Sequence, residues 1–198
     1  MAPAIAAPLV ELFSTMALIR AFETRVAELY RDGEIPGFVH LSLGQEAVAA
    51  GVAAALERDD YLTTTHRGHG HVLAKGADLN GMMAELFGRA SGLCGGKGGS
   101  MHVADATVGI LGANAIVGAG VPLAAGAALT SKLRDLGRVA VAFFGEGAVN
   151  QGAFHEAANL AAIWDLPLLL VCENNRYAEF TDSRAMCRVS RVADRAAA

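Results

Sequence analysis

Apolar residues recur every three or four positions near the start of the chain. They are Leu9, Phe13, Met16, Ile19, Phe22, Val26 and Leu29. This period predicts an amphipathic helix, which Asp32 and Gly33 end. Ser42 stands three residues before Gln45, and this capping-box spacing predicts a second helix that reaches about Leu56.

Further along the chain, the short stretch 61–65 is rich in β-branched residues and predicts a strand. The pattern over 79–87 predicts a helix, and residues 121–136 predict a helix of small residues that can pack closely against a partner. Residues 139–177 then show a strand, a glycine turn, a helix and a second strand. Together these elements predict an α/β fold with a parallel sheet flanked by helices.

Polar residues stand where both strands of the 139–177 segment end. Gly145, Glu146 and Gly147 follow the first strand, and Asn174 and Asn175 follow the second. In an open parallel sheet these two ends lie on the edge where ligands bind. A carboxylate, two amides and the start of the next helix suit a Mg²⁺ ion that holds a diphosphate.

Composition limits the classes of function. Hydrophobic residues make up 53% of the 198 residues and charged residues only 18%, which predicts apolar faces covered by another subunit. The net charge of −4 and the absence of a basic stripe argue against nucleic-acid binding. The three cysteines form no CxxC pair, which favours a reducing compartment. The longest apolar run, 115–129, is interrupted by glycines and is shorter than a membrane span, so we expect a cytoplasmic protein.

Five sequence blocks together resemble one enzyme family. GEGAVNQGAFHEAANLAAIWDLPLLLVCENNRY resembles the thiamine diphosphate signature, which usually reads GDG, a spacer and NN. GFVHLSLGQEAVAAG, THRGHGHVLAKG, GKGGSMH and NAIVGAGVPLAAGAAL are similar to α subunits of the E1 component of 2-oxo acid dehydrogenases. The acetoin dehydrogenase α subunit is especially similar, through IPGFVHL, THRGHGH and GILGAN. The resemblance extends from about Leu9 onward and implies a transketolase-like fold that binds thiamine diphosphate.

This resemblance also implies roles for single residues. The side chains of Glu146 and Asn175 and the carbonyl of Tyr177 would bind Mg²⁺. Gly145 and the backbone amides of Gly147 and Ala148 would also contact the cofactor. His66 and Arg67 would bind its diphosphate. The backbone of Ala115 and Val117 would contact its aminopyrimidine. His40 and His69 would lie on the substrate side, as candidate catalytic residues.

The resemblance implies a function shared with other chains. The family's enzymes decarboxylate a 2-oxo acid such as pyruvate, or cleave acetoin, and pass the acyl unit to a lipoyl group on an E2 partner. The carboxylate that activates the cofactor comes from a β subunit in an α₂β₂ assembly, so we expect this chain to be inactive alone. We divide it into a helix and turn over 1–36 and a cofactor-binding domain over 37–198.

Two departures from the family pattern matter. Glu146 stands where the motif usually has Asp, and its longer arm predicts a weaker or altered Mg²⁺ affinity, since Mg²⁺ demands near-ideal geometry. The family's chains also continue beyond this point, so we expect a fold that is truncated at its C-terminus. The alternative function is therefore a non-catalytic, cofactor-binding or assembly remnant.

Other motifs have less support. His66, His69 and His71 are spaced like zinc ligands, but no Cys or carboxylate lies close in the sequence. The glycine-rich stretch 92–100 does not match the P-loop pattern. The pairs Gly118 and Gly120, and Gly145 and Gly147, lack the third glycine of a dinucleotide-binding fingerprint. We interpret His155 and Glu156 as a solvated or interface helix face, and Cys172 as a core residue in a strand.

Overall fold

The computed structural model describes residues 9–197. These residues form two compact units, each continuous in space but built from two stretches of the chain. The first comprises the described residues up to Asp60 together with His66–Ala113, and the second comprises Tyr61–Thr65 together with the described residues from Asn114 onward. The domain boundary expected after Pro36 stays a prediction.

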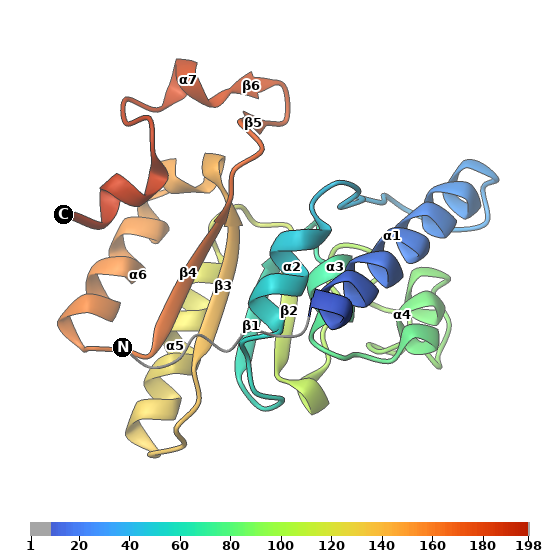
Figure 1. The fold of residues 1–198 in the computed structure, drawn as a ribbon, viewed down its shortest axis with the longest axis horizontal. Helices are drawn as coiled ribbons and strands as arrows, with labels where there is room; N and C mark the ends of the chain where they lie inside the picture. Colours follow the sequence, from blue (N-terminus) through green and yellow to red (C-terminus); the bar gives the residue numbers. More distant parts are fainter. Residues whose placement is uncertain (1–8, 198) are drawn as a thin grey trace. The chain divides into compact units, whose positions relative to one another are not determined.

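The first unit is mainly helical (Figure 1). Its helices are α1 (Leu9–Arg31), α2 (Glu46–Ala53), α3 (His69–Ala74) and α4 (Leu79–Leu86), followed by the short turn η1 (Ala106–Val108) and most of β2 (Ile110–Asn114). Helix α1 buries Ile19, Phe22, Val26 and Leu29, as its apolar period predicts. It packs against α2 and α3, which pack against each other.

The capping box predicted for α2 is absent. The helix begins at Glu46, three residues beyond the expected start, and Gln45 precedes it without a side-chain cap. Ser42 instead donates its hydroxyl to Oε1 of Glu23, at 2.7 Å. A cap would need Oγ of Ser42 to accept from the Gln45 N–H. That N–H donates instead to the main-chain carbonyl oxygen of Ser42, at 2.9 Å.

The second unit is built on parallel strands. β1 (Tyr61–Thr65), β3 (Ala140–Gly145) and β4 (Leu168–Glu173) lie side by side, with β3 in the middle. Helices α5 (Gly120–Leu133) and α6 (Gly152–Ile163) both pack on this sheet through one apolar core. This arrangement confirms the predicted α/β fold with a parallel sheet flanked by helices.

The central strand β3 is apolar throughout its sequence because both of its faces are buried. Ala140, Ala142 and Phe144 face the core shared with α5 and α6, and the alternate residues Val141 and Phe143 are also buried. A strand buried on both faces loses the alternation of apolar and polar residues seen in half-exposed strands. The edge position of β4 among the described strands leaves Leu169 partly exposed.

Two details after β3 differ from the sequence expectation. The acidic turn forms a 3₁₀ helix, η2 (Glu146–Asn150), so α6 begins only at Gly152. After β4 the chain forms a small hairpin, β5 (Tyr177–Ala178) and β6 (Thr181–Asp182), then α7 (Ser183–Met186) and η3 (Val192–Ala197). These last elements are too short to leave a periodic signal in the sequence.

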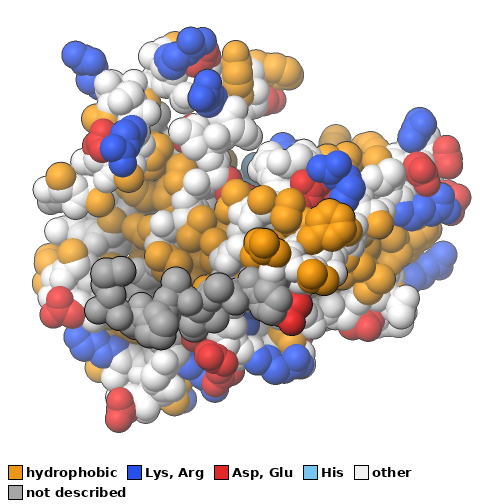
Figure 2. All heavy atoms as spheres, viewed as in Figure 1, with side chains coloured by type: hydrophobic (Ala, Val, Ile, Leu, Met, Phe, Trp, Pro, Cys, Tyr) orange, Lys and Arg blue, Asp and Glu red, His pale blue; other side chains and the backbone are white. Residues whose placement is uncertain are grey.

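Apolar side chains are exposed in both units. Leu9, Val10 and Phe13 lie on the surface of α1, and Leu169 and Ile163 on β4 and α6; Figure 2 shows apolar side chains over these elements. Among the described helices, none is both long enough and apolar enough to cross a membrane.

Candidate metal and diphosphate site

The strand ends that carry the acidic turn and the asparagines are neighbours. In the register of the β3–β4 pair, Gly145 lies opposite Glu173, so Glu146 and Asn174 leave adjacent strands at the same edge of the sheet. The expected juxtaposition of acid and amides after adjacent parallel strands is therefore confirmed.

Glu146 has the features of a ligand. Its side chain is 5% exposed, and among the described residues Oε1 has no hydrogen-bond partner. A buried carboxylate oxygen without a partner is costly, and a cation would remove that cost. Its negative charge also reaches the neighbouring strand, where burial and then Glu146 and Glu173 raise the pKa of the Cys172 thiol to about 12.

The two asparagines shape the chain after β4. Oδ1 of Asn174 accepts from the Arg176 N–H at 3.0 Å, and Oδ1 of Asn175 accepts from the Tyr177 N–H at 2.9 Å. Arg176 adopts a left-handed φ of 71°, which these side chain–backbone turns accommodate. An amide oxygen has two lone pairs, so Asn175 Oδ1 can still bind one more partner.

The β5–β6 hairpin lies against the acidic turn. A Cβ placed on Gly147 would be 2.6 Å from the Cβ of Ala178, closer than real carbon atoms approach. Only glycine therefore fits between Glu146 and the hairpin that carries Tyr177. Glu146, Asn175 and Tyr177 all belong to the second unit, and their role as Mg²⁺ ligands stays a prediction.

Ala115 and Val117 belong to the same unit, in the turn between β2 and α5. Oδ1 of Asn114 accepts from the Ile116 N–H at 2.8 Å and fixes the start of this turn. Gly118 follows with a φ of 84°, and a Cβ there would lie 3.2 Å from Gln151. Val117 is about half exposed.

The histidine candidates lie in the first unit. The rings of His40 and His66 meet edge to face, with centroids 4.8 Å apart. Burial is the first cause that lowers the pKa of each, and the charge of Arg67 lowers both further. Arg67 donates to the carbonyl oxygen of Leu41, and Nδ1 of His40 is buried without a partner among the described residues.

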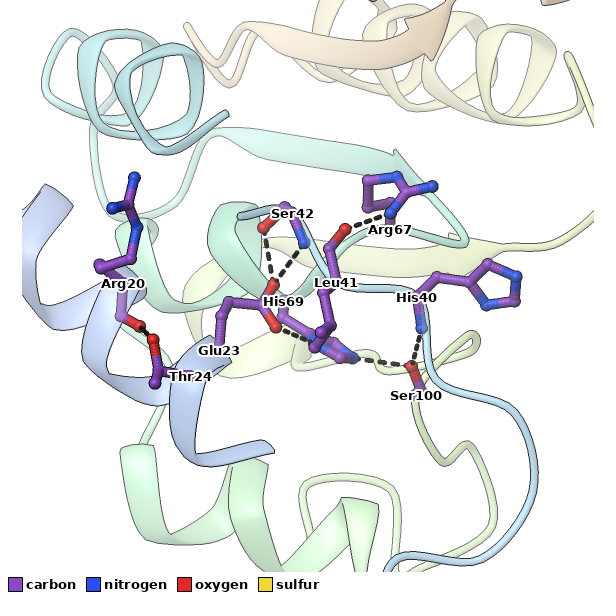
Figure 3. A network of polar contacts seen from close by, with 9 residues as sticks. All are labelled: Arg20, Glu23, Thr24, His40, Leu41, Ser42, Arg67, His69 and Ser100. Carbon is purple, nitrogen blue, oxygen red and sulfur yellow. Dashed lines mark hydrogen bonds and ion pairs between the residues drawn. The ribbon is translucent and has the colours of Figure 1, made fainter. Parts of the chain in front are cut away.

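His69 is fully buried, and both of its ring nitrogens are engaged. Nδ1 lies 3.0 Å from Oε2 of Glu23, and Nε2 lies 2.8 Å from Oγ of Ser100 (Figure 3). The sequence reasoning missed Glu23, although a signal exists: its spacing from Ile19 and Val26 puts a charged residue on the buried face of α1. The catalytic role of His69 stays a prediction.

The less favoured motifs have structural explanations. Within residues 9–197 no cluster of three His, Cys, Asp or Glu side chains could hold a metal ion by itself. The loop 92–100 wraps around Glu85, whose oxygens accept from the N–H groups of Cys94, Gly96, Gly98 and Gly99. His155 and Glu156 are exposed on α6, as expected.

Comparisons with known proteins agree with these observations. The family described as dehydrogenase E1 component matches residues 14–198. The chain is 57% identical over 187 residues to the α subunit of the acetoin:2,6-dichlorophenolindophenol oxidoreductase of Bacillus subtilis, covering 94% of this chain and 56% of that protein. It is 52% identical over 171 residues to the pyruvate dehydrogenase E1 component α subunit of Zymomonas mobilis, covering 86% and 48%. The chain thus spans about half the length of the curated relatives it matches.

Proposed function

This chain belongs to the dehydrogenase E1 component family, and we propose that it serves as the Mg²⁺- and diphosphate-binding part of an E1 α subunit that uses thiamine diphosphate. The buried, unpartnered Oε1 of Glu146 carries this proposal. It lies at the strand edge where ligands bind in parallel sheets, inside the segment that the family model matches.

The oxygen donors fit the metal by their chemistry. Glu146 supplies one carboxylate oxygen, Asn175 the free lone pair of its Oδ1, and Tyr177 its main-chain carbonyl. Mg²⁺ takes few protein ligands and completes its shell with phosphate and water oxygens, so a set of three suits it.

The other residues would hold the organic cofactor. The N–H groups of Gly147 and Ala148 lie in the first turn after β3 and suit a diphosphate, as does the planar guanidinium of Arg67. His66 would accompany Arg67, and the backbone of Gly145, Ala115 and Val117 would contact the rest of the molecule. When bound, thiamine diphosphate supplies a carbanion that attacks a carbonyl and stores the developing charge.

Substrate and partners follow from the relatives by analogy. We propose a 2-oxo acid such as pyruvate, or acetoin, as substrate, with His40 on the substrate side. A β subunit would complete the active site in an α₂β₂ assembly, and the lipoyl group of an E2 protein would accept the acyl unit. The free state of all three cysteines supports a cytoplasmic location.

Reconstitution tests the proposal. The chain, a β subunit, thiamine diphosphate and Mg²⁺ are combined, acetoin and pyruvate are supplied separately, and reduction of 2,6-dichlorophenolindophenol is followed. Activity with one substrate identifies it. If neither is oxidised, the catalytic reading is wrong for this chain as it stands, and the cofactor-binding remnant becomes the better description.

Cofactor binding is measured beside activity. In calorimetric titrations of Mg²⁺ with thiamine diphosphate into the reconstituted assembly, Glu146→Gln should weaken binding at least about tenfold, because it replaces a charged ligand with a neutral one. Glu156→Gln is the matched control, an exposed glutamate on α6 in the same unit. Equal weakening by both variants would contradict the assignment of Glu146.

A further inference from the structure

Glu23 lies at the centre of a buried polar network in the first unit (Figure 3). Its side chain is 0% exposed although it belongs to α1, a helix that otherwise buries apolar residues. An isolated carboxylate at such a position is strongly disfavoured. Neighbours therefore have to satisfy both of its oxygens, and they do so along two routes.

The first route is direct. Oε1 of Glu23 accepts two hydrogen bonds from Ser42, one from the backbone N–H at 2.9 Å and one from the hydroxyl at 2.7 Å. Ser42 is itself buried. These bonds fix the backbone of Ser42 and direct its hydroxyl toward α1.

The second route passes through His69. Oε2 of Glu23 is 3.0 Å from Nδ1 of His69, whose Nε2 is 2.8 Å from Oγ of Ser100. Ser100 Oγ in turn accepts from the backbone N–H of His40, at a longer 3.4 Å. The route thus ends on the backbone two residues before Ser42.

A carboxylate only accepts, so Nδ1 of His69 donates to Glu23. When the imidazole is neutral, its Nε2 accepts from the Ser100 hydroxyl. The Ser100 oxygen then has a lone pair free for the His40 N–H. Burial raises the pKa of Glu23, but the bonds from His69 and Ser42 together lower it below its ordinary value, which keeps the carboxylate ionised.

Leu41 connects the segment 40–42 to Arg67. Its carbonyl oxygen accepts from the guanidinium of Arg67. Each residue of the segment 40–42 thus has a backbone group bonded to a residue elsewhere in the first unit: His40 to Ser100, Leu41 to Arg67 and Ser42 to Glu23.

We propose that Glu23 is a positioning residue that holds the segment 40–42 at both ends, and so fixes His40 and Arg67 where substrate and diphosphate would bind. The roles of His40 and Arg67 rest on the proposed function; the network itself does not. Glu23 touches neither ligand and acts only through Ser42, His69 and Ser100.

Positioning accounts for the Glu–His–Ser arrangement better than nucleophilic catalysis does. The distances among Glu23, His69 and Ser100 resemble those of a serine nucleophile with its base and orienting acid. However, Ser100 is only 7% exposed, and its oxygen already accepts from the His40 N–H. The hydroxyl is therefore used within the protein.

Glu23→Gln gives a sharp test on the 198-residue chain. A glutamine has one oxygen for Ser42, and its amide group then faces Nδ1 of His69, so the imidazole must move its proton to Nε2. At a pH where the His69 ring is neutral, nitrogen-15 NMR of the histidine rings should show the Nδ1–H form in the wild type and the Nε2–H form in the variant. The side-chain resonances of His40 and Arg67 should shift in the variant as well.

A neighbouring substitution controls for general disturbance of α1. Thr24→Ala removes an exposed hydroxyl that donates to the Arg20 carbonyl one turn earlier. It should leave the resonances of His40, Arg67 and His69 unchanged. Unchanged His40 and Arg67 resonances in folded Glu23→Gln would overturn the proposal, as would equal shifts in Thr24→Ala.

Two further variants decide the question if Glu23→Gln does not fold, as judged by circular dichroism. Ser100→Ala should speed amide hydrogen exchange of His40 by about tenfold, the effect of losing one hydrogen bond. Ser42→Ala keeps the Ser42 N–H bond and should leave His40 exchange unchanged. No change at His40 in Ser100→Ala would break the second route and the proposal with it.

The reconstituted assembly separates this proposal from the proposed function. Glu23→Gln should lower kcat and weaken diphosphate binding, while Glu23→Asp, which keeps the charge, restores part of both. If the wild type proves inactive but the NMR changes occur, positioning stands and the proposed function fails. If the wild type is active and the NMR changes are absent, the reverse holds.

Discussion

Three of the buried glutamates in the described chain differ in what satisfies their oxygens. Glu23 bonds to two side chains and a backbone amide, and Glu85 bonds to four backbone amides of one loop. Glu146 keeps one oxygen without a partner in the described residues. The same residue type thus serves positioning, loop formation and, as we propose, metal binding, and the difference lies in the surrounding donors.

The length of the Glu146 side chain has a measurable consequence. Since Mg²⁺ demands near-ideal octahedral geometry, we expect Glu146→Asp to change the Mg²⁺ affinity by several-fold, in the direction of tighter binding. Mg²⁺ titration of both proteins with thiamine diphosphate present measures this. Equal affinities would show that the longer side chain of Glu146 has no special role. Absence of Mg²⁺ binding in both proteins would contradict the proposed site.

Glu85 should control the stability of the glycine-rich loop. Glu85→Gln leaves one acceptor oxygen for four amides and turns an NH₂ group toward the others, so we expect a loss of at least about 2 kcal/mol of unfolding free energy. Chemical denaturation measures the loss. Glu156→Gln, an exposed change of the same kind, should be nearly neutral; a similar loss there would argue against this explanation.

Low pH should weaken the contact between Glu85 and the loop 92–100. The bonds from Gly96, Cys94, Gly99 and Gly98 lower the pKa of Glu85 in spite of burial, which acts in the opposite direction. A lowered pKa means that the stabilisation is complete above the unfolded value near 4.5 and is lost as pH falls through the folded value below it.

At the scale of elements, the two glycines of α5 differ in how much space surrounds them. A Cβ on Gly120 would lie 3.3 Å from Oγ1 of Thr63 on β1, whereas one on Gly126 would meet nothing within 4 Å. The first glycine allows the helix to approach the strand, and Thr63 donates its hydroxyl to the Gly120 carbonyl at 2.9 Å. The second has no such role in the described structure.

Alanine substitutions at the two positions should therefore diverge. Gly126→Ala should stabilise the chain by about 0.5–1 kcal/mol, because alanine loses less backbone entropy in a helix. Gly120→Ala should lose that gain, since Thr63 must move. Thermal unfolding of the two variants gives the comparison, and equal gains at both positions would contradict the close approach.

Elements with long apolar periods were predictable, and their exact ends were not. The strand over residues 61–65 and the helices α1 and α4 follow from periodicity and turn residues. The capping box at Ser42 was wrong because the Gln45 N–H donates to the Ser42 main-chain carbonyl, and the Ser42 hydroxyl bonds to a buried carboxylate on another helix. The start of α6 shifted to Gly152 because the turn after β3 forms a 3₁₀ helix.

For the whole molecule, the paired histidines predict a dependence of stability on pH. Burial lowers the pKa values of both His40 and His66 below the ordinary 6.5. Arg67 and then His69 lower the pKa of His40 further, and His40 and then Arg67 lower the pKa of His66 further. Between the folded values and 6.5 the unfolded chain binds more protons, so stability is present above pH 6.5 and is lost as pH falls below it.

Thermal unfolding between pH 7.5 and 5.5 measures this dependence. His40→Gln and His66→Gln should each make the unfolding temperature less sensitive to pH over this range. Thr24→Ala, an exposed change that involves no titratable group, provides the control and should leave the sensitivity as it is. A wild-type unfolding temperature that does not fall toward pH 5.5 would contradict the assignment.

The sequence by itself determined the α/β class, the family and the place of the acidic turn. These depend on signals that are local in the chain: periods of apolar residues, a Gly-Glu-Gly turn and an Asn pair after consecutive strands. Parallel strands bring their ends to one edge regardless of finer packing, so the neighbourhood of Glu146 and Asn174 could be predicted.

Only the tertiary structure decided which donors meet which acceptors. Glu23 and Ser100 lie 77 positions apart in the chain, yet both bond to His69, and no local pattern encodes that meeting. Likewise, the open oxygen of Glu146 follows from burial among groups that offer it no proton. Hydrogen bonds act over a few ångströms and are independent of sequence separation, and for this reason the buried carboxylates acquired their separate roles only when the chain folded.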